Sequence, residues 1–167
     1  MEALESSLYF SKISSYAQGM ALLSAASAAY SWNLDLSEIA RIWTGGCIIR
    51  ADFLADIMRA YRKDPELDNL LLDPHIAHLS DASVGGARRT VITAKAWGIP
   101  SPGSSSALDY FDTLRQPLLP ANLIQAQRDY FGAHTYRRTD REGVFHTAWH
   151  GDQQPEETAP LQALTDV

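Results

Sequence analysis

A helical repeat of large apolar side chains near the N-terminus restricts the fold more than any other feature. Over residues 8–30 these side chains recur at alternating steps of four and three, which places them on one stripe of a helix: Tyr9, Ile13, Tyr16, Met20, Leu23 and Tyr30. Frequent alanines between them keep the helix surface thin, so that other helices can approach closely. We therefore predict one long helix here, packed against further helices.

Similar patterns continue along the chain, whereas the alternation typical of strands is nearly absent. A capping box at residues 35–38 predicts the start of a second helix. Further helices are expected over residues 48–61, from a cap at Asp81 or Ser83 to Trp97, and over residues 104–114. One short hairpin could join Tyr136 to residues 144–147. We predict an all-α fold with about five to seven helices.

Length and composition describe an ordinary globular protein with one core. The chain has 167 residues, of which 46% are hydrophobic and 20% charged. A net charge of −6 argues against nucleic acid as a partner. The N-terminus lacks the features of a signal peptide, and no apolar run is long enough to span a membrane. We expect a cytoplasmic protein with no membrane or nucleic-acid partner.

Three isolated side chains invite a chemical role that their surroundings do not support. His75 and His78 have a spacing that could ligate a metal, but they lack a third ligand, so no metal site is predicted. Lys12 has no acidic partner nearby and is expected in solvent or between helices. Cys47, the single cysteine, is expected to be a small buried packing residue in a reducing compartment.

Residues 119–136 predict a short helix with a defined end. Pro120 suits a first helical turn, and Gly132 suits the left-handed position that ends a helix. Arg128 is expected in the last turn and His134 on the segment that follows. A guanidinium and an imidazole could converge there on an anionic ligand. The alternative is that Arg128 closes helix carbonyls and that His134 packs on a neighbour.

A family resemblance favours the first interpretation. Residues 125–136 (QAQRDYFGAHTY) resemble the C-terminal signature of 6-phosphogluconate dehydrogenase, the decarboxylating enzyme of the pentose phosphate pathway. Residues 9–19 (YFSKISSYAQG) and 43–50 (WTGGCIIR) agree with it. The resemblance extends over residues 8–149 and covers less than half of such an enzyme.

The resemblance implies the second half of the family's helical domain together with its C-terminal tail. Residues 1–132 would be the helical domain, 133–150 an extended tail that crosses to the partner subunit of a homodimer, and 151–167 a mobile tail. Arg128 would bind the phosphate of 6-phosphogluconate, and His134 would help to hold this substrate. Both are binding roles.

The resemblance also implies what this chain lacks. The family oxidises the 3-hydroxyl of its substrate with NADP and then releases carbon dioxide, which yields ribulose 5-phosphate. Its lysine base and glutamate acid lie in the first helical half, and the chain contains no Gly-x-Gly-x-x-Gly sequence to hold NADP. We therefore assign no catalytic or cofactor-binding residue and expect the isolated chain to be inactive. The alternative function is a non-catalytic helical dimerisation module derived from this enzyme.

Overall fold

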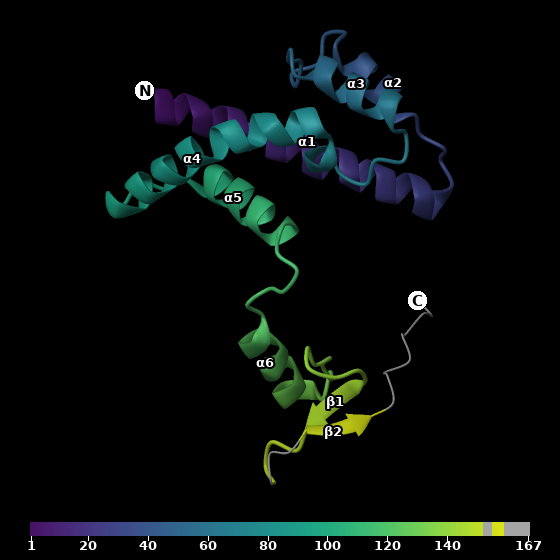
Figure 1. The fold of residues 1–167 in the computed structure, drawn as a ribbon, viewed down its shortest axis with the longest axis vertical. Coiled ribbons are helices and arrows are strands. Elements are labelled where there is room, and N and C mark those ends of the chain that lie inside the picture. Colours follow the sequence, from purple (N-terminus) through teal and green to yellow (C-terminus); the bar gives the residue numbers. More distant parts are fainter. Residues whose placement is uncertain (152–154, 159–167) are drawn as a thin grey trace. The chain divides into compact units, whose positions relative to one another are not determined.

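Helix α1 (Glu2–Tyr30) is the longest element of the computed structural model, which describes residues 1–151 and 155–158 (Figure 1). Its other elements are, in chain order, α2 (Leu36–Trp43), α3 (Leu54–Lys63), the 3-10 helix η1 (Leu70–Leu72), α4 (Pro74–Ala96), α5 (Pro102–Leu114), α6 (Asn122–Gly132), β1 (Val144–Thr147) and β2 (Pro155–Thr158). Six α-helices and one short antiparallel pair of strands within the described residues confirm the all-α prediction.

The contacts divide the chain into two compact units, Met1–Arg115 and Gln116–Val167. The first unit contains α1 to α5, and the second contains α6, β1 and β2. Helix α6 thus groups with the C-terminal residues, whereas the expected helical domain of residues 1–132 contains the whole first unit together with α6.

The core of the first unit forms where α1 packs against α4 and α5. Ile13 and Met20 of the predicted stripe are fully buried, but Tyr30 is 68% exposed. The buried side of α1 is completed by Phe10 and three small side chains. Its buried residues are Ser7, Phe10, Ile13, Ser14, Ala17 and Met20. Helix α4 comes very close to the start of α1, because a Cβ atom at Gly86 would lie 2.4 Å from Cβ of Ser6.

Local capping explains the start of α2, as the sequence predicted. Asp35 accepts a hydrogen bond of 3.1 Å from the backbone N–H of Glu38. The next helix begins later than expected, because residues 47–53 form turns and α3 starts at Leu54. Gly46, with φ of 93°, redirects the chain before this segment. Cys47 is only half-buried and Ile48 is fully exposed, so the prediction of a buried cysteine is wrong.

Helix α4 begins at Pro74 and not at Asp81 or Ser83, so the predicted cap is wrong. Asp73 accepts hydrogen bonds from the backbone N–H groups of His75 and Ile76, at 3.0 and 3.1 Å. The hydroxyl of Ser83 donates to the carbonyl of Leu79 at 2.7 Å, four residues earlier. Because this bond satisfies the hydroxyl inside the helix, Ser83 does not break it.

The second unit is organised around a short pair of strands. Strands β1 and β2 run antiparallel, with Val144 opposite Thr158 and Thr147 opposite Pro155. The expected hairpin with Tyr136 is reduced to a single bridge between Tyr136 and Phe145. Strand β2 lies in the segment expected to be a mobile tail; residues 152–154 and 159–167 of that segment are outside the described part of the chain.

Candidate substrate-binding site

The C-terminal end of α6 differs from the predicted helix stop. Gly132 is still helical, and Ala133 adopts the left-handed conformation with φ of 50° and ψ of 38°. Pro120 lies before the helix, because Ala121 is its N-cap. A different constraint explains the glycine: a Cβ atom at position 132 would lie 2.8 Å from Nε2 of His134. Gly132 therefore makes room for an imidazole ring.

Arg128 lies on α6, and His134 lies on the segment just after it. Arg128 is exposed, and its Nη1 donates a hydrogen bond of 3.3 Å to Oε1 of Gln125. The side chain thus points back toward the preceding turn, as helix geometry favours, and not toward the last carbonyls. His134 is also exposed, and its ring covers Gly132, which follows Arg128 by four residues. Positions four apart share a helix face, so Arg128 and the His134 ring occupy the same face.

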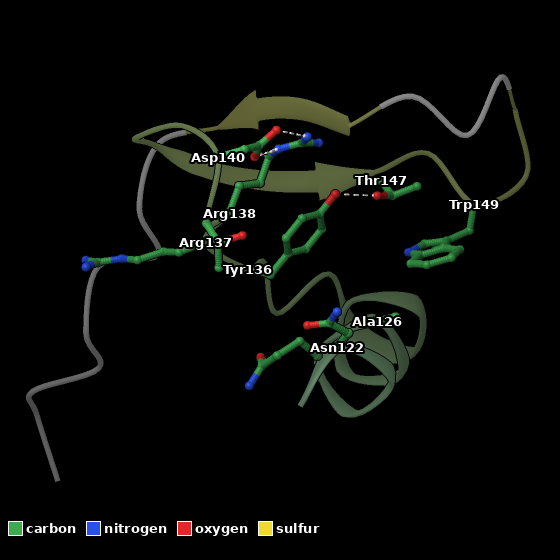
Figure 2. A pocket seen from close by; sticks show the side chains of 10 residues that line it. Asn122, Ala126, Tyr136, Arg137, Arg138, Asp140, Thr147 and Trp149 are labelled. Carbon is green, nitrogen blue, oxygen red and sulfur yellow. Dashed lines mark hydrogen bonds and ion pairs between the residues drawn. The ribbon is translucent and has the colours of Figure 1, made fainter. Parts of the chain in front are cut away.

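A pocket of about 400 Å³ lies beside this face (Figure 2). It is lined mainly by polar side chains of α6 and of the segment that follows: Asn122, Gln125, Ala126, Tyr136, Arg137, Arg138, Thr139, Asp140, Thr147 and Trp149. Arg138 is already paired with Asp140 at 2.6 Å, whereas Arg137 is exposed and extends away from the strands. Arg128 and His134 do not line this pocket; Arg128 is linked to it through its hydrogen bond to Gln125, which does.

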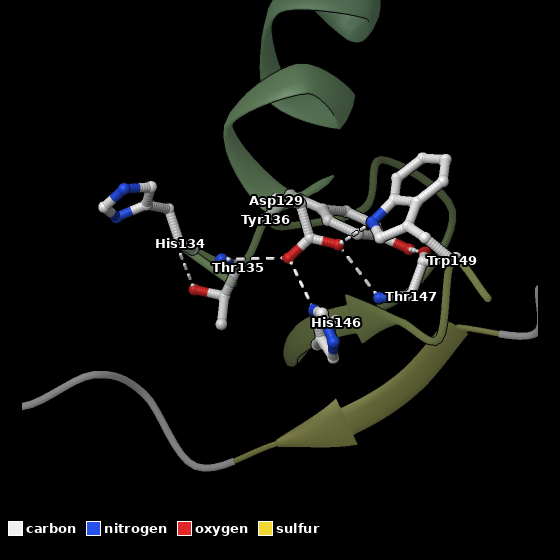
Figure 3. Close-up of polar contacts among 7 residues, drawn as sticks. All are labelled: Asp129, His134, Thr135, Tyr136, His146, Thr147 and Trp149. Carbon is white, nitrogen blue, oxygen red and sulfur yellow. Dashed lines mark hydrogen bonds and ion pairs between the residues drawn. The ribbon is translucent and has the colours of Figure 1, made fainter. Parts of the chain in front are cut away.

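Asp129 is the buried polar centre of the second unit, and sequence reasoning missed it. Its side chain has no exposed surface, and its carboxylate accepts four hydrogen bonds (Figure 3). The donors are Thr135 N at 3.1 Å, Thr147 N at 2.9 Å, Trp149 Nε1 at 3.0 Å and His146 Nδ1 at 2.9 Å. Because an ionised carboxylate only accepts, Nδ1 of His146 carries the proton.

The environment of Asp129 favours its ionised form. Burial raises the pKa of this carboxyl, but the hydrogen bonds from His146, Thr147 and Trp149 outweigh burial and hold the pKa below its ordinary value. One signal in the sequence was available. An acid near the C-terminal end of a helix is disfavoured by the helix dipole, so such a residue needs specific donors to compensate.

The backbone around His134 is strained. Ala133 and Thr135, which flank it, have φ values of 50° and 61°. A β-branched residue such as Thr135 rarely adopts positive φ, and the cost is on the order of 1–3 kcal/mol. The bond from Thr135 N to Asp129 helps to hold this conformation. Figure 3 shows the His134 ring pointing away from the Asp129 carboxylate.

The described residues contain neither a cluster of metal-ligating side chains nor the parallel strands of a Rossmann fold. They contain no group of three or more His, Cys, Asp or Glu side chains that could hold a metal ion. Nε2 of His75, one of the two histidines whose spacing could have suited a metal, lies 3.3 Å from Oδ1 of Asp56. The two strands described are short and antiparallel, unlike the parallel unit that binds NADP in a Rossmann fold. No helix in the described part has the length and apolar character needed to cross a membrane.

Comparison with known proteins shows the family to which this chain belongs. Residues 1–149 match the family model described as "6-phosphogluconate dehydrogenase, C-terminal domain". The chain belongs to the 6-phosphogluconate dehydrogenase family. A relative from Bacillus subtilis, the NADP(+)-dependent decarboxylating 6-phosphogluconate dehydrogenase, is 56% identical over 149 residues. The decarboxylating enzyme of Synechococcus elongatus is 55% identical over the same length.

A solved structure of a 6-phosphogluconate dehydrogenase has the same fold in this region. It is the Plasmodium falciparum enzyme, described in its apo form and in complexes with NADP+ and with 6-phosphogluconate, and it aligns with a TM-score of 0.82 and 49% identity over 88% of the chain. The chain spans about a third of these proteins: the matched region covers 32% of the Bacillus relative and 32% of the Plasmodium chain.

Proposed function

We propose that this chain is the C-terminal part of an NADP-dependent, decarboxylating 6-phosphogluconate dehydrogenase, and that it binds the phosphate of the substrate. The observation that carries the proposal is the position of Arg128 and His134. Both are exposed, and the ring of His134 lies over Gly132 on the same face of α6 as Arg128, near a pocket of about 400 Å³, in a chain 56% identical to an enzyme of that name.

The chemistry of the two side chains fits this role. Arg128 has a planar fork of donors that matches phosphate oxygens. Among the described residues its guanidinium makes one weak hydrogen bond, to Gln125, which leaves most of these donors available. His134 adds a donor from the other end of the same helix face. The site is completed in the partner subunit, where the tail of residues 133–150 would reach the bound 6-phosphogluconate.

The remaining chemistry belongs to the rest of the enzyme. NADP accepts the hydride from the 3-hydroxyl carbon of 6-phosphogluconate, and loss of carbon dioxide yields ribulose 5-phosphate. Residues described here hold and orient the substrate and move no proton. We place the enzyme in the cytoplasm, in keeping with the single cysteine of this chain, which fits a reducing compartment.

A homodimer is part of the same proposal. We do not place its interface on the apolar stripe of residues 8–30, because Ile13 and Met20 of this stripe are buried within the first unit. Several large apolar side chains remain exposed on α1, on and beside α4, and on α6: Leu8, Leu22, Ile92, Trp97, Leu123 and Phe131. Apolar surface of this kind favours association with a second copy or with the rest of the enzyme.

Substitution of Arg128 tests the phosphate assignment in the full-length enzyme that contains this chain. Arg128→Ala should remove on the order of 2–4 kcal/mol of substrate binding. The KM for 6-phosphogluconate should therefore rise roughly thirty-fold or more, at about 1.4 kcal/mol per factor of ten. The KM for NADP should stay the same, and Arg128→Lys should recover only part of the loss. A lower melting temperature with an unchanged KM for 6-phosphogluconate would end the assignment.

A chimera separates the enzyme from the alternative of a non-catalytic dimerisation module. Residues 1–149 of this chain would replace the matching segment of the Bacillus subtilis relative, to which they are 56% identical. Formation of NADPH from 6-phosphogluconate, weakened by Arg128→Ala, supports the proposed function. A chimera that folds, dimerises and binds NADP but does not oxidise the substrate supports the alternative.

A further inference from the structure

We propose that Asp129 is a positioning residue that holds Arg128 and His134 in the geometry required for phosphate binding. The inference rests on the proposed function, and it adds a residue that does not touch the substrate. Its basis is a single hydrogen bond: Thr135 N donates to Oδ1 of Asp129 at 3.1 Å. This bond joins the chain neighbour of Arg128 to the chain neighbour of His134.

A buried carboxylate at the position of Asp129 is energetically unfavourable, so its presence there indicates a specific role. Its carboxylate is completely buried and lies near the C-terminal end of α6, where the helix dipole repels a negative charge. Burial of an unpaired charge is costly, whereas an apolar residue of similar size would pack there without this penalty. Four donors offset the cost, and they come from three separate places along the chain.

These donors connect the helix to three later parts of the second unit. Thr135 lies just after the helix, His146 and Thr147 lie on β1, and Trp149 lies beyond β1. One carboxylate therefore fixes the direction in which the chain leaves α6. Such a connection also stabilises the fold, so stability alone does not distinguish positioning from packing.

The strain beside His134 is what makes positioning the better explanation. His134 lies between two residues with positive φ, and its ring covers Gly132 on the face of Arg128. Without the bond from Thr135 N to Asp129, the chain can relax to ordinary φ values, and the imidazole then leaves this face. The ring itself points away from the carboxylate, so Asp129 acts on it only through the backbone (Figure 3).

The test uses Asp129→Asn, which keeps the shape of the side chain but turns one acceptor into a donor. In the full-length enzyme, the KM for 6-phosphogluconate should rise about tenfold or more, whereas kcat and the KM for NADP should change less than about twofold, because Asp129 affects binding geometry and not chemistry. In the 167-residue chain, the amides of Thr135 and Thr147 should lose their protection from hydrogen exchange.

Two further variants keep the proposal falsifiable. His146→Leu removes one donor and retains a similar volume; it should remain folded and raise the KM for 6-phosphogluconate by about threefold, less than Asp129→Asn does. Asp112→Asn is the matched control, since it breaks the two-bond pair with Arg88 in the other unit. It should lower the melting temperature and leave every KM unchanged.

The outcomes separate this inference from the proposed function. If Arg128→Ala raises the KM for 6-phosphogluconate but Asp129→Asn and His146→Leu do not, the positioning role is overturned. If Asp129→Asn preserves the exchange protection of Thr135, it is overturned as well. An unchanged KM in Arg128→Ala counts against the proposed function and, with it, against a role of Asp129 in phosphate binding, whereas the exchange experiment decides separately whether Asp129 holds the chain at Thr135.

Discussion

Substitution of Gly132 by alanine should separate stability from substrate affinity. Alanine favours a helical position over glycine by roughly 0.5–1 kcal/mol. The new Cβ atom, however, would lie 2.8 Å from Nε2 and 3.0 Å from Cδ2 of His134, too close for the ring to stay in place. Because His134 is exposed, its ring can turn outward at a cost of about 0.5–1.5 kcal/mol. These two contributions nearly cancel, so the fold should tolerate the change.

The same displacement should weaken substrate binding. A hydrogen bond to a charged group contributes about 1.5–3 kcal/mol, so its loss corresponds to a KM for 6-phosphogluconate raised about tenfold or more. We expect the melting temperature of the 167-residue chain to change by less than about 4 °C. Steady-state kinetics of the full-length enzyme and a thermal melt of the chain measure the two effects.

Gly103→Ala is the control for this substitution. Gly103 is also helical, on α5, and a Cβ atom there would have no neighbour within 4 Å. This variant should leave the KM for 6-phosphogluconate unchanged. If Gly132→Ala raised that KM no more than Gly103→Ala does, the ring position of His134 would have no bearing on binding, and our account of Gly132 would be refuted.

Two further predictions concern acid stability and association. The pKa of Asp129 in the folded chain lies below its ordinary value of 3.8, so its stabilising effect is complete above that value and is lost as the pH falls through the lowered pKa. The melting temperature, measured from about pH 7 to about pH 3, should therefore fall at the acid end, and it should fall less in Asp129→Asn than in the unchanged chain. An equal fall in both proteins would disprove the lowered pKa of Asp129. Sedimentation of the chain at micromolar concentration should show a defined dimer formed through its exposed apolar side chains, and a clean monomer would contradict this.

Local signals in the sequence predicted much of the helical framework correctly. The patterns correctly indicated the capping role of Asp35 and the helix expected over residues 104–114, which is α5. Such features depend on residues within a few positions of one another, through capping hydrogen bonds and the period of the helix. The resemblance of residues 125–136 to 6-phosphogluconate dehydrogenase was equally readable, and the family match confirms it.

The tertiary structure decided the features that depend on distant residues. Residues 47–53 have an apolar pattern suited to a helix but form turns. The sequence indicated that Gly132 ends the helix, but position 132 requires glycine because a Cβ atom there would meet the ring of His134. The role of Asp129 depends on donors as far away as Trp149, 20 positions along the chain. Its neighbours in the sequence carry no information about these donors, because only the folded chain brings them to one carboxylate.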